Sequence, residues 1–125
     1  MPKIEVSARF EPDVLKAYAK NDAMLVITVK NLDGVPYWCE CDVSVKHPLS
    51  LAYDRELGIG RTRMGILKPG GMIEKKIKIF TLPNNFPDDY QVAMTAYVYG
   101  EDGAIAERLE KSESVPCKDQ AAVKK

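Results

Sequence analysis

The feature that most constrains this fold is an alternation of apolar and polar side chains that returns in several short segments of the chain. It is clearest over residues 37–46, where one set of alternate positions is small and apolar and the other is mostly polar. The first set is Cys39, Cys41, Val43 and Val45, and the second is Trp38, Glu40, Asp42, Ser44 and Lys46. A period of two is typical of a β-strand with one buried face, and Pro48 ends the strand because proline cannot donate a hydrogen bond to a sheet.

The other strands follow from the same pattern and from the turn residues between them, such as Asp33-Gly34 and Pro69-Gly70. Seven strands are predicted, at residues 4–10, 23–30, 37–46, 62–67, 72–80, 90–99 and 104–115. Residues 14–19 fit either a short edge strand or a helical turn. The last segment contains good helix formers, but the glycine turn before it favours a strand.

The spacing of these strands selects the architecture. Short strands divided by turns are typical of an antiparallel sandwich or barrel. The long connection from Leu49 to Arg63 follows three strands, at the point where a Greek key must cross between two sheets. We therefore predict an all-β, seven-stranded antiparallel Greek-key β-sandwich. Its expected core is Leu25, Ile27, Val29, Cys41, Val43, Val45, Ile77, Ile79, Tyr90, Val92, Met94 and Val98.

Length and composition fit a single globular domain. The chain has 125 residues, of which 46% are hydrophobic and 29% are charged. We place the sandwich at residues 1–117 and a polar C-terminal tail at residues 118–125, because the tail shows no core pattern.

Charge and hydropathy exclude two classes of partner. The 18 basic and 18 acidic residues balance, so the strongly basic footprint of a nucleic-acid binder is missing. No apolar run approaches the roughly 20 residues that span a bilayer. The first residues contain no apolar signal core. We therefore expect a cytoplasmic protein that binds neither nucleic acid nor membrane.

The three cysteines agree with a reducing compartment. Cys39 and Cys41 are two residues apart, so on a strand they share a face, where a disulfide between them is sterically poor. One hypothesis is a small metal or redox protein in which His47 or Cys117 adds ligands. The preferred interpretation is that both are core residues, because zinc sites usually carry a second ligand pair that this chain lacks.

No motif of catalysis or cofactor binding is found. The chain has one histidine, His47, at a predicted strand end, and it lacks a phosphate-binding loop, a dinucleotide-binding glycine pattern and a nucleophile elbow. We expect no catalytic residue, no cofactor and no metal, and hence no enzyme. A further hypothesis is the binding of an anion or oligosaccharide by the loop from Arg55 to Arg63, which also contains Arg61.

Three short motifs resemble those of a known fold family. Residues 25–31 end in a V-x-V-x-N-like strand followed by Gly34, residues 67–71 form an L-x-P-G turn, and Asp89-Tyr90 stands where a G-x-Y element opens a later strand, without its glycine. Over residues 4–115 the chain resembles immunoglobulin-like β-sandwich domains of the cell-adhesion-related bacterial and archaeal type, and it is similar to small stand-alone archaeal proteins of this fold. The resemblance implies a buried tyrosine at position 90 and a binding or spacer role without catalytic residues.

Three aromatic residues indicate where such a module binds. Trp38, Tyr97 and Tyr99 alternate with the predicted core positions of their strands, and these two strands are neighbours in the resembled fold. Aromatic residues are enriched at interfaces. We predict a non-enzymatic protein-interaction module that binds a protein partner or a second copy of itself through this surface. Two alternatives are that the rings only support the sheet, or that the connection from Leu49 to Arg63 covers them.

Overall fold

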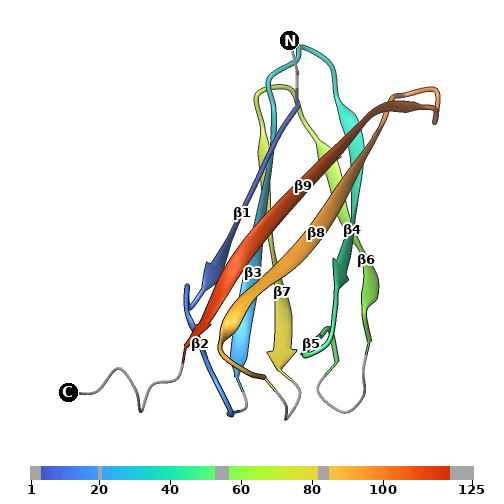
Figure 1. Cartoon of the computed structure of the whole chain (residues 1–125). Helices are drawn as coiled ribbons and strands as arrows, with labels where there is room; N and C mark the ends of the chain where they lie inside the picture. The colour runs from blue at the N-terminus through green and yellow to red at the C-terminus, as the bar shows by residue number, and fades with distance from the viewer. Residues whose placement is uncertain (1–3, 20, 53–56, 82–84, 119–125) are drawn as a thin grey trace.

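A computed structural model describes residues 4–19, 21–52, 57–81 and 85–118, and this part of the chain consists of strands and connections without a helix (Figure 1). The strands are β1 (Ile4–Glu11), β2 (Leu15–Lys16), β3 (Asp22–Asn31), β4 (Tyr37–Val45), β5 (Leu49–Ser50), β6 (Ile59–Leu67), β7 (Met72–Thr81), β8 (Asp88–Tyr99) and β9 (Ile105–Lys118). The predicted all-β class is confirmed.

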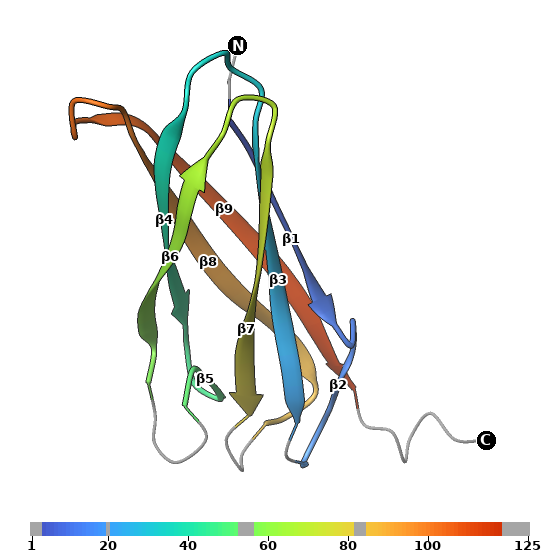
Figure 2. The ribbon, with the colours of Figure 1, turned by 180° about the vertical axis from the view of Figure 1, so that it is seen from behind.

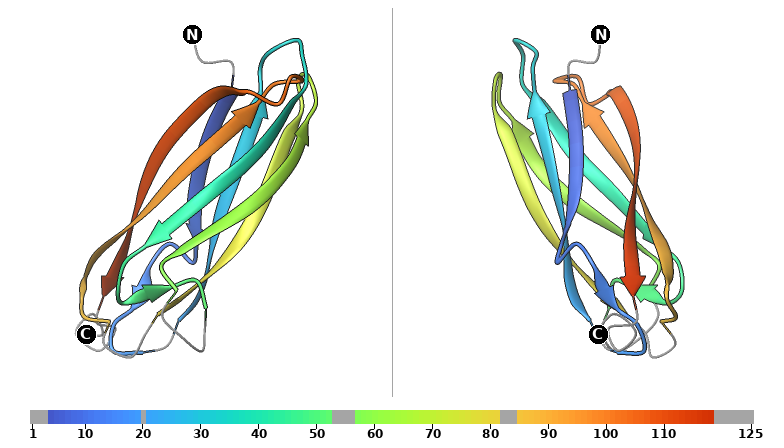
Figure 3. Two further views of the ribbon diagram at one scale, coloured as in Figure 1. Left: turned by 90° about the vertical axis from the view of Figure 1, so that its right-hand side faces the viewer. Right: turned by 60° about the vertical axis from the view of Figure 1, so that its left-hand side comes forward.

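The strands form two sheets that pack face to face, as Figures 2 and 3 show from other sides. One sheet has four strands in the order β1-β3-β7-β5, and the other has five in the order β2-β9-β8-β4-β6. Neighbouring strands are antiparallel, except that β2 runs parallel to the end of β9. The fully antiparallel arrangement that we predicted is therefore wrong at this one pair.

The strand count also differs from the prediction, with nine described strands in place of seven. The two additional strands, β2 and β5, have two residues each, which is too short for an alternation to show. β2 falls in the segment that we predicted as an edge strand or a helical turn. β9 extends through Lys118, past the predicted domain boundary, and residues 119–125 of the predicted tail lie outside the described residues.

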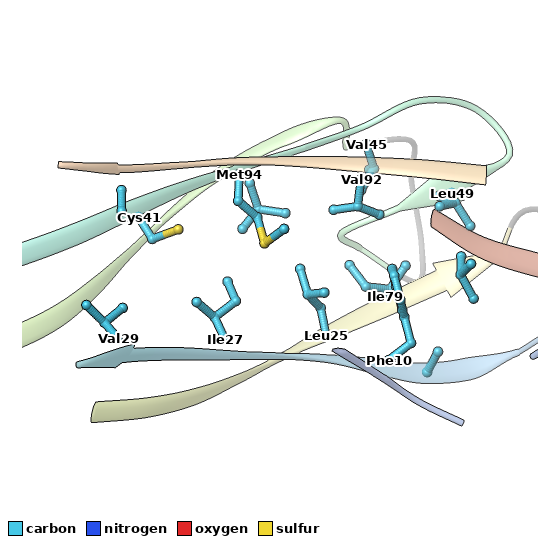
Figure 4. Close-up of a cluster of buried hydrophobic side chains, with 14 of the residues drawn as sticks. Phe10, Leu25, Ile27, Val29, Cys41, Val45, Leu49, Ile79, Val92 and Met94 are labelled. Carbon is cyan, nitrogen blue, oxygen red and sulfur yellow. The ribbon is translucent and has the colours of Figure 1, made fainter. Parts of the chain in front are cut away.

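The core lies between the two sheets (Figure 4), where side chains such as Cys41 and Met94 point from one sheet toward Ile27 and Leu25 of the other. Of the twelve predicted core residues, all are buried except Ile77 and Tyr90, which are half-buried and pack against the cluster. Tyr90 is less buried than predicted, and its hydroxyl donates a hydrogen bond to the carbonyl of Phe86 in the preceding connection.

One buried polar side chain ties the two sheets together at the end where the β3–β4, β6–β7 and β8–β9 connections gather in Figure 1. Asn31 is 1% exposed, and its Nδ2 donates to the carbonyl oxygens of Val35 (2.8 Å) and Leu67 (3.0 Å). Its Oδ1 accepts a hydrogen bond from the Asp33 amide at 2.8 Å. Because Asn31 ends β3 and Leu67 ends β6, these bonds fix the relative position of the two sheets where the candidate site begins.

Candidate interaction surface

An apolar row crosses the outer face of the five-stranded sheet near this end. Trp38 on β4 pairs with Ile66 on β6 and with Tyr99 on β8, and Tyr99 pairs with Ile105 on β9. Ile66 is 64% exposed, Ile105 56% and Trp38 37%. We call these four residues the apolar row, and the outer face that carries them the aromatic face. Large apolar side chains aligned across four strands are unusual on a solvated sheet surface.

Two β-bulges turn the isoleucines at the ends of this row outward. The pairing of β4 with β6 shifts between Cys39 and Glu40, opposite Gly65, which has a φ of 108°. The pairing of β8 with β9 shifts between Val98 and Tyr99. A bulge adds one residue and reverses the faces that follow it. Alternation without the bulges would send Ile66 and Ile105 inward.

Polar side chains occupy the next two rows of the aromatic face, on the same four strands. From β6 to β9 these rows are Arg63, Glu40, Tyr97 and Arg108, then Arg61, Asp42, Thr95 and Glu110. The face therefore combines an apolar band at one end with a charged region beside it.

Hydrogen bonds join the apolar row to this charged region. The Trp38 Nε1 donates to Glu40 Oε2 at 2.9 Å, which fixes the indole on the sheet surface. The Arg61 guanidinium donates to both oxygens of Asp42, with Nε to Oδ1 at 2.6 Å and Nη2 to Oδ2 at 3.0 Å, and reaches Glu40 at 3.4 Å. The Arg61 hydrogen bond lowers the pKa of Asp42, so the carboxylate stays charged at neutral pH.

Two arginines hold the third aromatic residue. The guanidinium carbon of Arg61 lies 5.3 Å from the centre of the Tyr97 ring, and that of Arg108 lies 5.9 Å from it. Both distances are within the range of a cation–π interaction. The Tyr97 ring is therefore contacted from both the β6 and the β9 sides.

The three residues predicted for an interaction surface lie together on this face. Trp38 pairs directly with Tyr99, and Glu40 beside it pairs with Tyr97. The alternation of the sequence did not identify Ile66 or Ile105 as members of this surface, because an unbroken alternation places neither on it. The signals that mark the two positions are Gly65 within β6 and the glycine turn before β9.

The predicted long connection from Leu49 to Arg63 divides between the two sheets. Leu49 and Ser50 form β5 in the four-stranded sheet, and β6 begins at Ile59, earlier than predicted. Arg61 and Arg63 are thus strand residues, and Arg61 is bound to Asp42 and Glu40. Arg55 lies outside the described residues. The hypothesis of an anion-binding loop gains no support from this arrangement.

The cysteines lie in the core. Cys39 and Cys41 are both fully buried and face inward from β4, and Cys117 is buried near the other end of the molecule, on β9. Burial raises the pKa of Cys39 to about 12 and that of Cys41 to about 11, so both thiols stay protonated. His47 is exposed beyond the end of β4, and within the described residues no three metal-ligating side chains cluster. The metal hypothesis is not supported.

A shallow hollow of about 380 Å³ lies beside Thr95 and Glu110 on the aromatic face, and others lie away from it. Two shallow grooves of about 420 and 540 Å³ follow the open side of the sandwich between β1 and β9. Charged residues such as Glu5, Lys30 and Lys111 line the first, and Arg9 and Glu113 line the second. Both are wide open, so we place the candidate site on the flat aromatic face.

Comparison with known proteins supports the fold. The chain is similar to part of E. coli alpha-2-macroglobulin in its native conformation, with a TM-score of 0.59 and 16% sequence identity. The alignment covers 91% of this chain and 7% of that one, so this chain spans a small part of that protein's length. A likeness at this identity shows the fold alone, an immunoglobulin-like β-sandwich.

Two other solved structures are similar at a lower level. The alkylpurine DNA glycosylase AlkC of Pseudomonas fluorescens, bound to DNA, gives a TM-score of 0.45 at 12% identity, over 93% of this chain and 30% of that one. A PapD-like (ASH) domain of human CEP192 gives 0.43 at 13% identity, over 94% of this chain and 84% of that one. No protein-family model and no curated protein matches the sequence. In the described part of the chain, no helix of the length and hydropathy needed to cross a membrane is present.

Proposed function

We propose that this chain is a non-enzymatic, immunoglobulin-like protein-interaction module that binds its partner through the aromatic face. The observation that carries the proposal is the pair of β-bulges that turn Ile66 and Ile105 outward, in line with Trp38 and Tyr99. Each bulge leaves a residue without its pairing in the sheet. Two bulges on different strands that expose apolar side chains in one row favour a surface used for binding.

The composition of the face fits a protein partner. Tryptophan, tyrosine and arginine dominate the binding energy of protein interfaces, and Trp38, Tyr97, Tyr99 and Arg61 lie within three adjacent rows. The hydrogen bonds of Trp38 and Arg61 fix their side chains in advance, which lowers the entropy lost on binding. A fixed aromatic surface beside a charged region gives both affinity and orientation.

The cytoplasm remains our proposed location, supported by three buried free thiols, which a reducing environment preserves. We also propose that a Greek-key connection joins the strands of the two sheets, and that the sandwich is of the cell-adhesion-related type. Nucleic acid and membrane are not proposed as partners, because the charges of the sequence balance.

A photo-crosslinking experiment tests the surface. A benzoyl-phenylalanine is placed at Ile66 on the aromatic face or, as the matched control, at Met72 on the opposite outer face, which is 58% exposed. After irradiation in the native cell extract, the probe at position 66 should give discrete protein adducts and the probe at position 72 should not. Equal adducts from both positions, or none from position 66, would contradict the proposal.

A stability measurement separates an interface from a structural cover. In the variant Tyr97→Ser/Tyr99→Ser, an interaction surface predicts a loss of association with a change in unfolding free energy of about 1 kcal/mol or less. If the rings instead form a second small core, urea denaturation should show a loss of about 3 kcal/mol or more. That larger loss would count against the proposed function.

A further inference from the structure

We propose that a second copy of this chain covers the aromatic face, related to the first by a two-fold axis that runs parallel to the strands between β8 and β4. The inference rests on the proposed function and names its partner. It commits to one of the two arrangements that keep the strands of the two copies aligned, in which the axis runs either along the strands or across them.

The direction of the apolar row decides between these two ways. An axis parallel to the strands keeps every row at its own level, so the two apolar rows stack, with Ile66 against Ile105 of the second copy and Trp38 against its Tyr99. An axis across the strands would place the apolar row against a row of the second copy that is mostly small and polar. That row consists of Ile59, Ser44, Ala93 and Ser112. With full overlap of the four rows, only the first arrangement stacks the two apolar rows, because an axis across the strands does so only where it runs along the apolar row and leaves the other rows without a partner.

The charged rows favour the same axis at the rim. An axis parallel to the strands brings β6 of one copy opposite β9 of the other, so Arg61 faces Glu110 of the second copy in the third row, on both sides of the dimer. The Arg61 side chain is 51% exposed and that of Glu110 is 66% exposed, so a second copy can reach both, although Arg61 is bonded to Asp42 and Glu110 to Arg108 (3.0 Å) within one chain. In the second row Arg63 faces Arg108 of the second copy, which opposes binding. The resulting contact is apolar along the row at one end of the face and mixed in charge in the two rows beside it.

The size of the face predicts a modest affinity. Four strands about 4.8 Å apart and about 30 Å long offer roughly 600 Å² per copy. Two copies therefore bury about 1,200 Å² together, the lower limit of stable specific interfaces. Two sheets that pack face to face keep their strands within about 30° of each other, so the rows stay close to register across the contact. We expect a dimer that dissociates on dilution.

Site-specific crosslinking between two variants tests the axis. A chain carrying Ile66→Cys is mixed with a chain carrying Ile105→Cys and treated with a short bis-maleimide. In the proposed dimer, two copies of the same variant place their cysteines three strand spacings apart across the face, about 14 Å, so a shorter reagent cannot join them. Cys39, Cys41 and Cys117 are 0–3% exposed and do not compete for the reagent.

The proposed axis predicts a covalent dimer in the mixture, with at least tenfold less from either variant alone. The further substitution Glu110→Arg, which places two arginines face to face, should lower the yield severalfold. Met72→Cys mixed with Ile105→Cys is the matched control and should give no dimer. Equal yields from the single variants would overturn the axis.

Sedimentation equilibrium of the unmodified chain provides the second measurement. A concentration-dependent dimer is expected, and Trp38→Ser should weaken it about thirtyfold, as loss of a central aromatic anchor does. A chain that stays monomeric at every concentration and gives no crosslink would overturn the second copy as the partner. The photo-crosslink at position 66 is then decisive for the proposed function, because adducts with a different protein would leave that function intact.

Discussion

The two outer faces of the sandwich are built from the same alternating strands but differ in how they meet solvent. On the four-stranded sheet, which we call the charged face, Arg9 bonds Glu11 at 2.9 Å and approaches Glu74 at 3.9 Å, and Lys76 approaches Glu11 at 3.9 Å. On the aromatic face, the comparable positions near one end are Trp38, Tyr99 and two isoleucines. One face is covered by its own charged side chains, whereas the other leaves apolar area open.

Val26 shows what this difference means. It points outward on the charged face, yet it is 0% exposed, between Arg9 on β1 and Lys76 on β7. Long charged side chains cover apolar surface with their alkyl stems while their charges stay in water. Ile66 and Ile105 on the aromatic face lack such cover and remain more than half exposed. The exposure of an outward-facing apolar side chain thus depends on whether its neighbours cover it, since Met72 on the charged face, which is 58% exposed, is also left open at the start of β7.

The largest effect is expected at the residue that joins the two sheets. Asn31→Ala removes three hydrogen bonds and leaves the buried Leu67 carbonyl without its donor, so unfolding should become easier by about 2–4 kcal/mol. Urea denaturation measures the change. Thr28→Ala, on the same strand but half-buried on the charged face, is the control and should cost about 1 kcal/mol or less. If both variants lose a similar amount of unfolding free energy, the hydrogen bonds of Asn31 contribute little to holding the two sheets together.

A smaller effect is expected at the bulge that turns Ile66 outward. Gly65 adopts a φ of 108°, which an L side chain adopts only with strain, although the space beside it is open to a methyl group. Gly65→Ala should therefore cost about 1–2 kcal/mol in urea denaturation. Gly34→Ala, in a connection with open space and ordinary backbone, is the matched control. If the Gly65 variant is as stable as the control, the bulge does not require glycine, and its role in shaping the aromatic face is weakened.

Alternation predicted the long strands and ten of the twelve core residues because a period of two assigns every side chain in a strand to a face. It failed where the pattern carries too little information. β2 and β5 are two residues long, and β6 begins within Gly58-Ile59-Gly60, a segment that has the sequence of a turn. Strand pairing with β4, rather than local propensity, makes Ile59 and Gly60 part of the sheet.

The sequence predicted the aromatic residues of the candidate site but not its aliphatic residues. Trp38, Tyr97 and Tyr99 follow from the alternation of β4 and β8 with no irregularity between them and the core. Ile66 and Ile105 each lie beyond a bulge, and one additional residue moves a side chain to the opposite face. The Arg61 network was also missed, since the partners Glu40 and Asp42 are 21 and 19 residues away in sequence.

A small pH effect is expected on the aromatic face, because the pair of Arg61 and Asp42 lies at the surface, where water screens it. The folded-state pKa of Asp42 lies below its usual value of 3.8. The pair therefore contributes its full stability above pH 3.8, and this contribution is lost as the pH falls through the lower pKa of the folded state. Denaturant titrations between pH 5 and 2 should show less acid sensitivity in Asp42→Asn than in the unmodified chain. Unchanged acid sensitivity would mean that the bond contributes little in solution.

The smallest effect is expected on the charged face. Arg9→Gln removes contacts with Glu11 and Glu74, but the Arg9 side chain is 56% exposed, so the ion pairs contribute about 0.5 kcal/mol or less, and less again in high salt. Glutamine keeps part of the alkyl stem over Val26, whereas Arg9→Gly removes it. If the stem matters more than the charge, Arg9→Gly should cost more than Arg9→Gln even at high salt, where the ion pairs are screened. Since glycine also lowers strand stability by itself, Ser7→Gly on the same strand supplies the correction. A cost for Arg9→Gly no larger than that of Ser7→Gly would mean that Val26 is buried without help from Arg9, and the contrast between a covered and an open face would then rest on Lys76 alone.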